Sequence, residues 1–391
     1  MTTTEHALYL LYTCRVMCQY WLIQLAFTPE RVLSSNAAVS DFGFRYTLGD
    51  RNVFKGTDVH KRAIKQQYSK PGHLEETAQL YWKFLKDALE KEVPCDVHQA
   101  VLVEDFFVTA RRIILRTITY EMIGKNVVDK YDTINNTDFI SDFMIFQDLV
   151  EDCTAKAAVC PTWLASVLFL KDCERRRLLI VSRLSDAMNR IFDGGDEASV
   201  GKWLQSLYNM KRSDDTDTRL YQCDDIGDFA VGLLFAGHKN PAIAAAQAVL
   251  FSLEFDNRRA TDSTGSVGNG SPLMTEAYAE AKSVQQLMLG TSETNKSSSL
   301  SNNNDNAKDI HYSTLMQEGL NSCVIIEKVV VETLRVTAHS IGAVRKVMVQ
   351  EGWKVSVEDE RNPSCPVKHY ILPYGTYVGV SHIIPHRNKL M

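Results

Sequence analysis

The longest apolar helical pattern in the chain covers residues 222–255 and is interrupted at its centre by His238, Lys239, Asn240 and Pro241. A helix that crossed a membrane here would bury the charge of Lys239 in lipid, at a large cost in free energy. We therefore expect a long helix in the core of a folded domain. Because Pro241 has no backbone N–H, we also expect it to kink this helix.

Helical spacing of apolar side chains dominates the rest of the chain. It predicts four further helices, over residues 72–92, 98–124, 171–193 and 312–336, with Gly124 as the stop of the second. Near the C-terminus, residues 370–372, 373–375 and 376–380 are typical of a strand, a tight turn and a strand. The expected fold class is mainly α with a minor β-sheet.

Residues 256–310 differ in composition from the rest, because they are rich in Ser, Asn, Gly and Thr. Such a segment has too little apolar surface to offset the entropy lost on ordering, so we expect a flexible insertion with a short helix at about 274–289. The predicted organisation is a helical core over 1–255, the insertion over 256–310, and a final helix with the sheet over 311–391.

Composition excludes several classes of function. The net charge of −5 gives no support to nucleic-acid binding. The nine cysteines are scattered without a C-x-x-C pair, which argues against a disulfide framework or a structural zinc site and favours buried thiols. The ten histidines form no metal-ligand cluster, and common signatures such as the P-loop, H-E-x-x-H and G-x-S-x-G are missing.

Residues 7–28 are apolar and aromatic enough to raise the question of a membrane span. Arg15 and Gln19 interrupt this run, and it has no basic n-region with a small-residue cleavage site. We interpret it as a strand and a helix of a globular core, and interfacial membrane contact is the alternative.

One ordered series of short motifs does carry information about function. It begins with Glu332 and Arg335 in an E-T-L-R sequence, where residues three apart share a helix face and can form one inward-facing charged unit. Alone, this spacing also fits a surface pair of little energetic value. It is followed by I-G-A-V-R-K-V at 341–347, Y-I-L-P-Y-G-T-Y-V-G-V-S at 370–381 and H-R at 386–387.

This order resembles the K helix and following sheet of the cytochrome P450 family, nearest its sterol 14-demethylase branch. Residues 231–238, V-G-L-L-F-A-G-H, are similar to the I helix of that branch. The resemblance implies a P450-like helical domain, and the chain looks like a fragment that is incomplete at both ends. The family's haem-ligating loop, F-x-x-G-x-x-x-C-x-G, does not occur before Met391, and Cys365 lacks its surrounding residues.

The resemblance also implies roles for individual residues. Glu332 and Arg335 would form the family's structural pair, and Arg345 would contact a haem propionate. Tyr46 and Lys61 stand where the family places further residues near the propionates. Ala236 and Gly237 would lie over the distal face of the haem, although close helix packing explains the same two residues. Asn240 replaces the alcohol that usually follows them, so the expected catalytic set is Ala236, Gly237 and Asn240.

The activity that the resemblance implies is haem-thiolate monooxygenation, a demethylation or hydroxylation of a lipophilic substrate, with a sterol as the specific candidate. Electrons would come from NADPH through a cytochrome P450 reductase, at the cytosolic face of the endoplasmic reticulum membrane. Two alternatives stay open. One is a non-catalytic P450-like remnant, and the other is a helical membrane-associated scaffold whose contact surfaces are residues 7–28 and 229–251. The ordered motifs after residue 312 argue against the scaffold.

Overall fold

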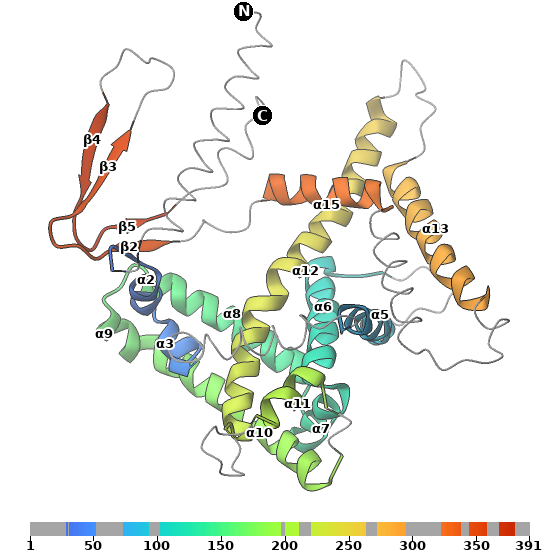
Figure 1. Cartoon of the computed structure of the whole chain (residues 1–391), viewed down its shortest axis with the longest axis horizontal. Coiled ribbons are helices and arrows are strands. Elements are labelled where there is room, and N and C mark those ends of the chain that lie inside the picture. The colour runs from blue at the N-terminus through green and yellow to red at the C-terminus, as the bar shows by residue number, and fades with distance from the viewer. Residues whose placement is uncertain are drawn as a thin grey trace, which may run out of the picture. The chain divides into compact units, whose positions relative to one another are not determined.

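A computed structural model describes residues 29, 31–51, 73–93, 102–196, 200–210, 220–262, 272–294, 322–337, 344–357 and 367–379. These residues are mainly helical and carry two small antiparallel sheets, which confirms the predicted fold class at this level (Figure 1). The chain forms two compact units. The first comprises 1–54, 150–174 and 334–391, and the second comprises 55–149 and 175–333, so the division passes through three helices.

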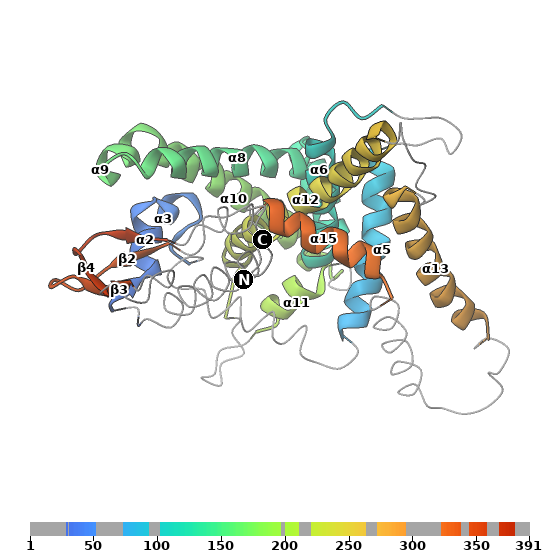
Figure 2. The ribbon, with the colours of Figure 1, turned by 90° about the horizontal axis from the view of Figure 1, so that it is seen from above.

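The described residues of the second unit form helices and the turns between them, and they contain no strand. Its helix α6 packs against both α5 and α12, as the two views of the ribbon show (Figures 1 and 2). Its helices, in chain order, are α5 (His73–Glu92), α6 (Phe106–Met122), α7 (Lys125–Asn135), α8 (Phe139–Ala157), α10 (Lys171–Asp193), α11 (Lys202–Tyr208), α12 (Cys223–Asp262), α13 (Leu273–Thr294) and α15 (Val324–Thr337), of which α8, α10 and α15 extend into the first unit.

Helix α6 begins and ends at recognisable signals. The carboxylate of Asp105 accepts a hydrogen bond from the backbone N–H of Val108, which satisfies one of the free donors of the first turn. The helix ends beside Gly124, which has a φ of 107° and begins α7. The predicted stop at Gly124 is therefore confirmed, although α6 is shorter at its N-terminal end than the predicted 98–124.

Helix α12 continues through Pro241 as one element. The proline leaves only the carbonyl of Gly237 without its usual intrahelical donor. One face of the helix is buried along its length, with Ala230, Leu234, His238 and Ala242 each fully buried at a spacing of four residues. About one residue in every turn is therefore buried. This packing explains why the polar residues 238–241 do not end the helix.

The region predicted as a flexible insertion is more helical than expected. Helix α12 extends to Asp262, and the short helix predicted at 274–289 corresponds to the longer α13. The carboxylate of Asp256 on α12 accepts hydrogen bonds from the backbone N–H groups of Leu273 and Met274, at 2.6 and 3.0 Å. Asp256 thus caps the N-terminus of α13 from another helix, which a segment's own composition does not reveal.

The first unit contains both sheets. Strands β1 (Leu33–Ser34), β2 (Arg345–Val347) and β5 (Tyr377–Val378) form an antiparallel sheet in the order β1-β2-β5, and β3 (Trp353–Val357) pairs with β4 (Lys368–Leu372). Leu33 lies opposite Val347, and both are fully buried. The short helices of this unit are α2 (Ser35–Asp41), α3 (Phe44–Thr47), α9 (Thr162–Ala165) and the π-helical turn η2 (Ser166–Leu170).

The predicted strand, turn and strand near the C-terminus are present, with Gly375 in the turn at a φ of 84°. The two strands belong to different sheets, because β4 pairs with β3 while β5 pairs with β2. The sheet of β2 also takes a strand from residues 33–34, more than three hundred positions earlier in the chain. The predicted location of the sheet near the C-terminus was therefore incomplete.

Within the described ranges, no helix combines the length and the apolar character that a membrane span requires. The apolar run at residues 7–28 lies outside those ranges.

Candidate functional site

The three residues predicted to be catalytic lie together on one exposed edge of α12. Ala236, Gly237 and Asn240 are all exposed, and the helical spacing of one and four residues places them on the same side of the helix. A Cβ atom added at Gly237 would meet no atom within 4 Å among the described residues. The alternative explanation of close helix packing at this glycine therefore has no support in the described part of the chain.

This edge of α12 carries two polar groups. The carbonyl of Gly237 has lost the hydrogen bond that residue 241 would donate in a regular helix, because residue 241 is a proline. The side-chain amide of Asn240 lies one turn away from this carbonyl. An acceptor and an amide on an edge of small residues can hold a polar group of a ligand or a water molecule.

His238 points in the opposite direction, into the core of the second unit. Its side chain is fully buried, and its ring meets Phe143 edge to face with centroids 5.7 Å apart. Nδ1 lies 2.8 Å from the carbonyl oxygen of Leu234, which fixes the proton on Nδ1, and Nε2 has no hydrogen-bond partner in the described part of the chain. Burial lowers the pKa of His238 to about 4, and the nearby charges of Arg111 and Lys239 act in the same direction.

The predicted cofactor residues Arg345 and Tyr46 both belong to the first unit. Arg345 lies on β2 and Tyr46 on α3, and each side chain is half-buried. Among the residues that the structure describes, neither the guanidinium of Arg345 nor the hydroxyl of Tyr46 has a hydrogen-bond or ion-pair partner. Both groups are donors that an anionic ligand could use.

Lys346, the neighbour of Arg345, forms an ion pair instead. Its ammonium lies 2.5 Å from the Oδ2 of Asp41 on α2, and the hydroxyl of Tyr377 on β5 donates to the same oxygen at 2.6 Å. The ring of Tyr377 stacks on Phe42, with centroids 5.5 Å apart. Burial, followed by the hydrogen bond to Asp41, raises the pKa of Tyr377 to about 12. This cluster attaches α2 to the sheet.

The structure describes only part of the remaining predicted residues, which are Lys61, Glu332 and Arg335. Lys61 lies outside the described residues. Glu332 lies on α15 with an exposed side chain, in contrast to the inward orientation that the E-x-x-R spacing predicted, and Thr333 is the buried residue of that turn. The backbone of Arg335 is helical, but its side chain falls outside what the structure describes, so the predicted pair stays a prediction.

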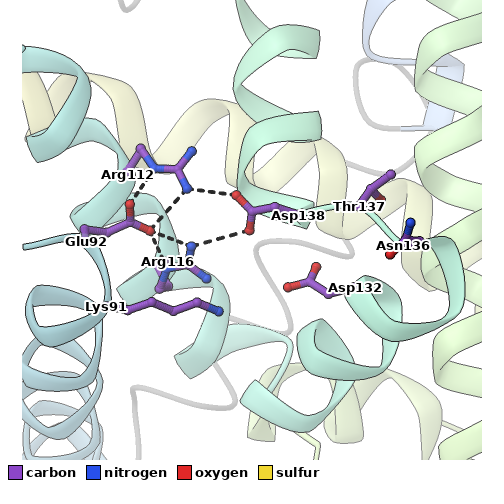
Figure 3. A pocket seen from close by; sticks show the side chains of 8 residues that line it. All are labelled: Lys91, Glu92, Arg112, Arg116, Asp132, Asn136, Thr137 and Asp138. Carbon is purple, nitrogen blue, oxygen red and sulfur yellow. Dashed lines mark hydrogen bonds and ion pairs between the residues drawn. The ribbon is translucent and has the colours of Figure 1, made fainter. Parts of the chain in front are cut away.

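The structure also contains a polar pocket that the sequence did not indicate, with a volume of about 440 Å³ in the second unit (Figure 3). It is lined by the ends of α5 and α7, by α6 and by the loop before α8. Its lining residues are Lys91, Glu92, Arg112, Arg116, Asp132, Asn136, Thr137 and Asp138.

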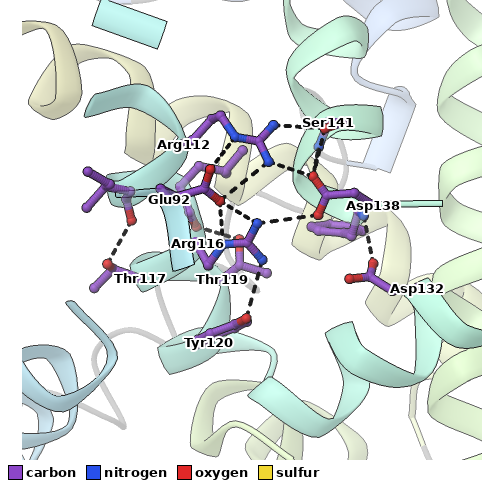
Figure 4. A network of polar contacts seen from close by, with 12 residues as sticks. Glu92, Arg112, Arg116, Thr117, Thr119, Tyr120, Asp132, Asp138 and Ser141 are labelled. Carbon is purple, nitrogen blue, oxygen red and sulfur yellow. Dashed lines mark hydrogen bonds and ion pairs between the residues drawn. The ribbon is translucent and has the colours of Figure 1, made fainter. Parts of the chain in front are cut away.

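An ion-pair network fills one wall of this pocket (Figure 4). The carboxylate of Glu92 accepts from Arg112 at 2.5 Å and from Arg116 at 2.5 Å, and Asp138 accepts from Arg112 at 2.8 Å. Every guanidinium nitrogen of the two arginines makes a hydrogen bond, including those to Tyr120 and Ser141. The network therefore joins α5, α6 and the loop before α8. Every nitrogen of these two arginines already has a partner, so none is free to bind a ligand.

The pKa values of two carboxylates of the pocket, those of Asp138 and Asp132, are shifted in opposite directions. Burial alone would raise the pKa of Asp138, but hydrogen bonds from Ser141 and Arg112 lower it to about 2. Burial raises the pKa of Asp132, although its carboxylate caps the backbone N–H of Phe139 at 2.7 Å. The sequence did hold one signal for this site, because Arg112 and Arg116 are one turn apart on the same face of a predicted helix.

Comparison with models of known protein families gave no match to this chain, and comparison with curated proteins found none of significant similarity.

Proposed function

We propose that these residues belong to a haem-thiolate monooxygenase of the cytochrome P450 type that acts on a lipophilic substrate. The observation that carries the proposal is the ordered series of motifs from residue 332 to residue 387, preceded by V-G-L-L-F-A-G-H at 231–238. A sterol is the specific substrate candidate, because the motifs are nearest those of the sterol 14-demethylase branch. The electrons would come from NADPH through a reductase at the endoplasmic reticulum membrane.

The residues that the proposal assigns to haem have the donor chemistry that this group requires. Arg345 and Tyr46 are half-buried donors without a partner in the described part of the chain, and haem propionates are carboxylates. Lys61 would add a second cation by resemblance alone. The bound haem would supply the oxygen-activating redox chemistry. The protein's own contribution would be to hold the propionates and to leave room over the ring.

The proposal gives the edge of α12 two tasks. Ala236 and Gly237 would keep the space above the ring free, since a methyl group placed on Gly237 would have no neighbour within 4 Å among the described residues. Asn240 would hold a water molecule or a substrate oxygen beside the free carbonyl of Gly237. An amide does not take up and release a proton as an alcohol does, so proton delivery would have to use the water that Asn240 holds.

A second candidate is a P450-like protein that binds no haem and has no activity. The substitution of Asn240 for the alcohol, with Pro241 directly after it, is the specific observation that favours this candidate. In that case, the open edge of α12 would reflect loss of the site and would not serve ligand binding.

A haem titration separates these candidates. The recombinant protein, extended by any residues that are encoded in frame after codon 391, is titrated with haemin, and binding is followed by quenching of tryptophan fluorescence and by the shift of the haem absorption band. The monooxygenase proposal predicts saturable binding of one haem per chain. Absence of saturable binding by a folded protein would favour the second candidate. A haem-free protein that stays in the membrane fraction after high salt and carbonate would instead indicate a membrane-associated scaffold.

A further inference from the structure

The polar pocket of the second unit has lining residues that its ion-pair network does not use. The network pairs two carboxylates with two guanidinium groups, so it carries no net charge. The lining residues outside the network are Lys91, Asp132, Asn136 and Thr137. In Figure 3 no dashed line joins any of these four side chains to another residue that is drawn. Their polar groups are therefore available to a ligand in the pocket.

Lys91 supplies a positive charge to the pocket. It lies in the last turn of α5, and its side chain is exposed. Among the residues that the structure describes, its ammonium has neither a hydrogen bond nor an ion pair. An ammonium carries three donors and no acceptor. Lys91 can therefore bind a carboxylate of a ligand without giving up a contact that the structure describes.

Asp132 supplies a negative charge to the same pocket. Its Oδ1 accepts a hydrogen bond from the backbone N–H of Phe139 at 2.7 Å, and its other oxygen has no hydrogen-bond partner in the described part of the chain. Burial raises the pKa of Asp132 despite this hydrogen bond and the nearby charge of Lys91. The protein therefore compensates only part of the charge of this carboxylate, and a ligand ammonium would compensate the rest.

Asn136 and Thr137 add neutral polar groups to the pocket. Asn136 is exposed just after α7, with a φ of 49°, and its side-chain amide has no partner among the described residues. The hydroxyl of Thr137 is buried and likewise has no hydrogen-bond partner in the described part of the chain. An amide and a hydroxyl both donate and accept hydrogen bonds, so they suit a polar and uncharged side chain of a ligand.

We propose that this pocket binds a free α-amino acid with a polar, uncharged side chain, its carboxylate on Lys91 and its ammonium on Asp132. The lining residues comprise three cationic and three anionic side chains, which favours a ligand without net charge over an anion or a cation. The volume of about 440 Å³ lies in the range of small-molecule sites, which is roughly 300–1,000 Å³. This inference does not rest on the proposed monooxygenase function.

Isothermal titration calorimetry of the folded full-length protein tests the proposal, with L-serine, L-threonine, L-asparagine and L-glutamine as the probes. We expect saturable binding of one molecule per chain for at least one of them. Two analogues of that amino acid then each lack one charge, because the N-acetylated acid has no ammonium and the α-amide has no carboxylate. Each analogue should bind about tenfold or more weakly.

Two variants assign the charges to their partners. Lys91→Met should weaken binding of the amino acid about tenfold or more but leave the affinity for the α-amide unchanged, because the α-amide has no carboxylate to lose. Asp132→Asn should do the same for the N-acetylated acid, and its side-chain oxygen can still accept from the N–H of Phe139. Lys130→Met is the matched control, because Lys130 is an exposed lysine on α7 that does not line the pocket. It should bind like the wild type.

Two results would overturn the proposal. One is the absence of saturable binding of all four amino acids by the folded wild-type protein, which would mean that the pocket holds only solvent. The other is an amino acid that binds the wild type, Lys91→Met and Asp132→Asn with equal affinity, because its site would then lie elsewhere. Thermal unfolding confirms that each variant is folded, and the first result needs no variant.

Discussion

The guanidinium of Arg116 on α6 lies 2.5 Å from Oε1 of Glu92 on α5, and only 1% of the arginine side chain is exposed. Arg112 shares the same carboxylate from one turn away, with its Nε 2.5 Å from Oε2. The carboxylates of Glu92 and Asp138 together face the two guanidinium groups. Loss of the Glu92 carboxylate would leave Asp138 alone against both cations, in a site where the side chain of Arg116 is almost fully buried.

The first prediction follows from this arrangement. Glu92→Ala is expected to lower the free energy of unfolding of the second unit by about 3–5 kcal/mol, because breaking a buried ion pair leaves an uncompensated charge. Chemical denaturation followed by circular dichroism measures the change. Asp148→Ala is the matched control. Asp148 pairs with Arg111, which lies on α6 like Arg112 and Arg116, but the side chain of Asp148 is 56% exposed. This control should cost about 0–1 kcal/mol. Equal costs for the two variants would contradict the structural role of Glu92.

The second prediction concerns acid stability and His238. Burial depresses its folded pKa to about 4, below its ordinary value of 6.5, so the unfolded chain takes up a proton at a higher pH than the folded one. The stability contributed by the neutral ring is fully present above pH 6.5 and is lost as the pH falls from 6.5 towards 4. The loss amounts to roughly 3 kcal/mol over this window.

The groups around His238 are Arg111 on α6, Lys239 on α12 and Asp148 on α8. His238→Gln removes the titrating ring, so the dependence of unfolding free energy on pH should flatten between pH 4 and 6.5. An unchanged slope in His238→Gln would show that the ring does not titrate as its burial requires.

The third prediction uses two glycines with opposite surroundings. Gly237→Ala is expected to stabilise the protein by about 1 kcal/mol, because the position is helical and a Cβ meets no atom within 4 Å in the described residues. Gly201→Ala is expected to destabilise it by roughly 2–3 kcal/mol, because its Cβ would overlap the carbonyl oxygen of Met122. Thermal unfolding of the two variants measures both effects. A destabilised Gly237→Ala protein would mean that this edge of α12 is packed.

The fourth prediction tests the proposed cofactor residues with two neighbours on β2. Arg345→Met should leave stability within about 0.5 kcal/mol of the wild type, because the side chain has no described partner, but should weaken haem binding about tenfold or more. Lys346→Met should show the reverse, with lower stability and unchanged haem affinity, because Lys346 is paired with Asp41. Haemin titration and thermal unfolding of each variant provide the two readings. Equal haem affinities would remove Arg345 from the proposed site.

The sequence predicted best what depends on local periodicity. Helices α5 and α10 match the predicted ranges to within a residue, since each has a regular apolar face over about twenty positions. The C-terminal ends of α12 and α13 were less well predicted, because both helices continue into a segment whose composition favours a loop. The cap that Asp256 gives to the N-terminus of α13 joins residues that are distant in sequence, and periodicity does not detect it.

The residues of the candidate site were likewise predicted only in part. Ala236, Gly237 and Asn240 share an exposed edge as the helical spacing required, while the orientation of His238 into the core was not predicted. The pocket around Glu92 was missed because its charges come from four places in the chain, and each of them alone fits an ordinary solvated face.

Sequencing the transcript beyond codon 391 is the most direct test of whether these residues belong to a haem-thiolate monooxygenase. We predict that an F-x-x-G-x-x-x-C-x-G sequence follows in the same reading frame, with its cysteine as the axial ligand of the haem iron. A stop codon immediately after codon 391 in the mature transcript would exclude a haem-thiolate enzyme, because the 391 residues contain no such loop.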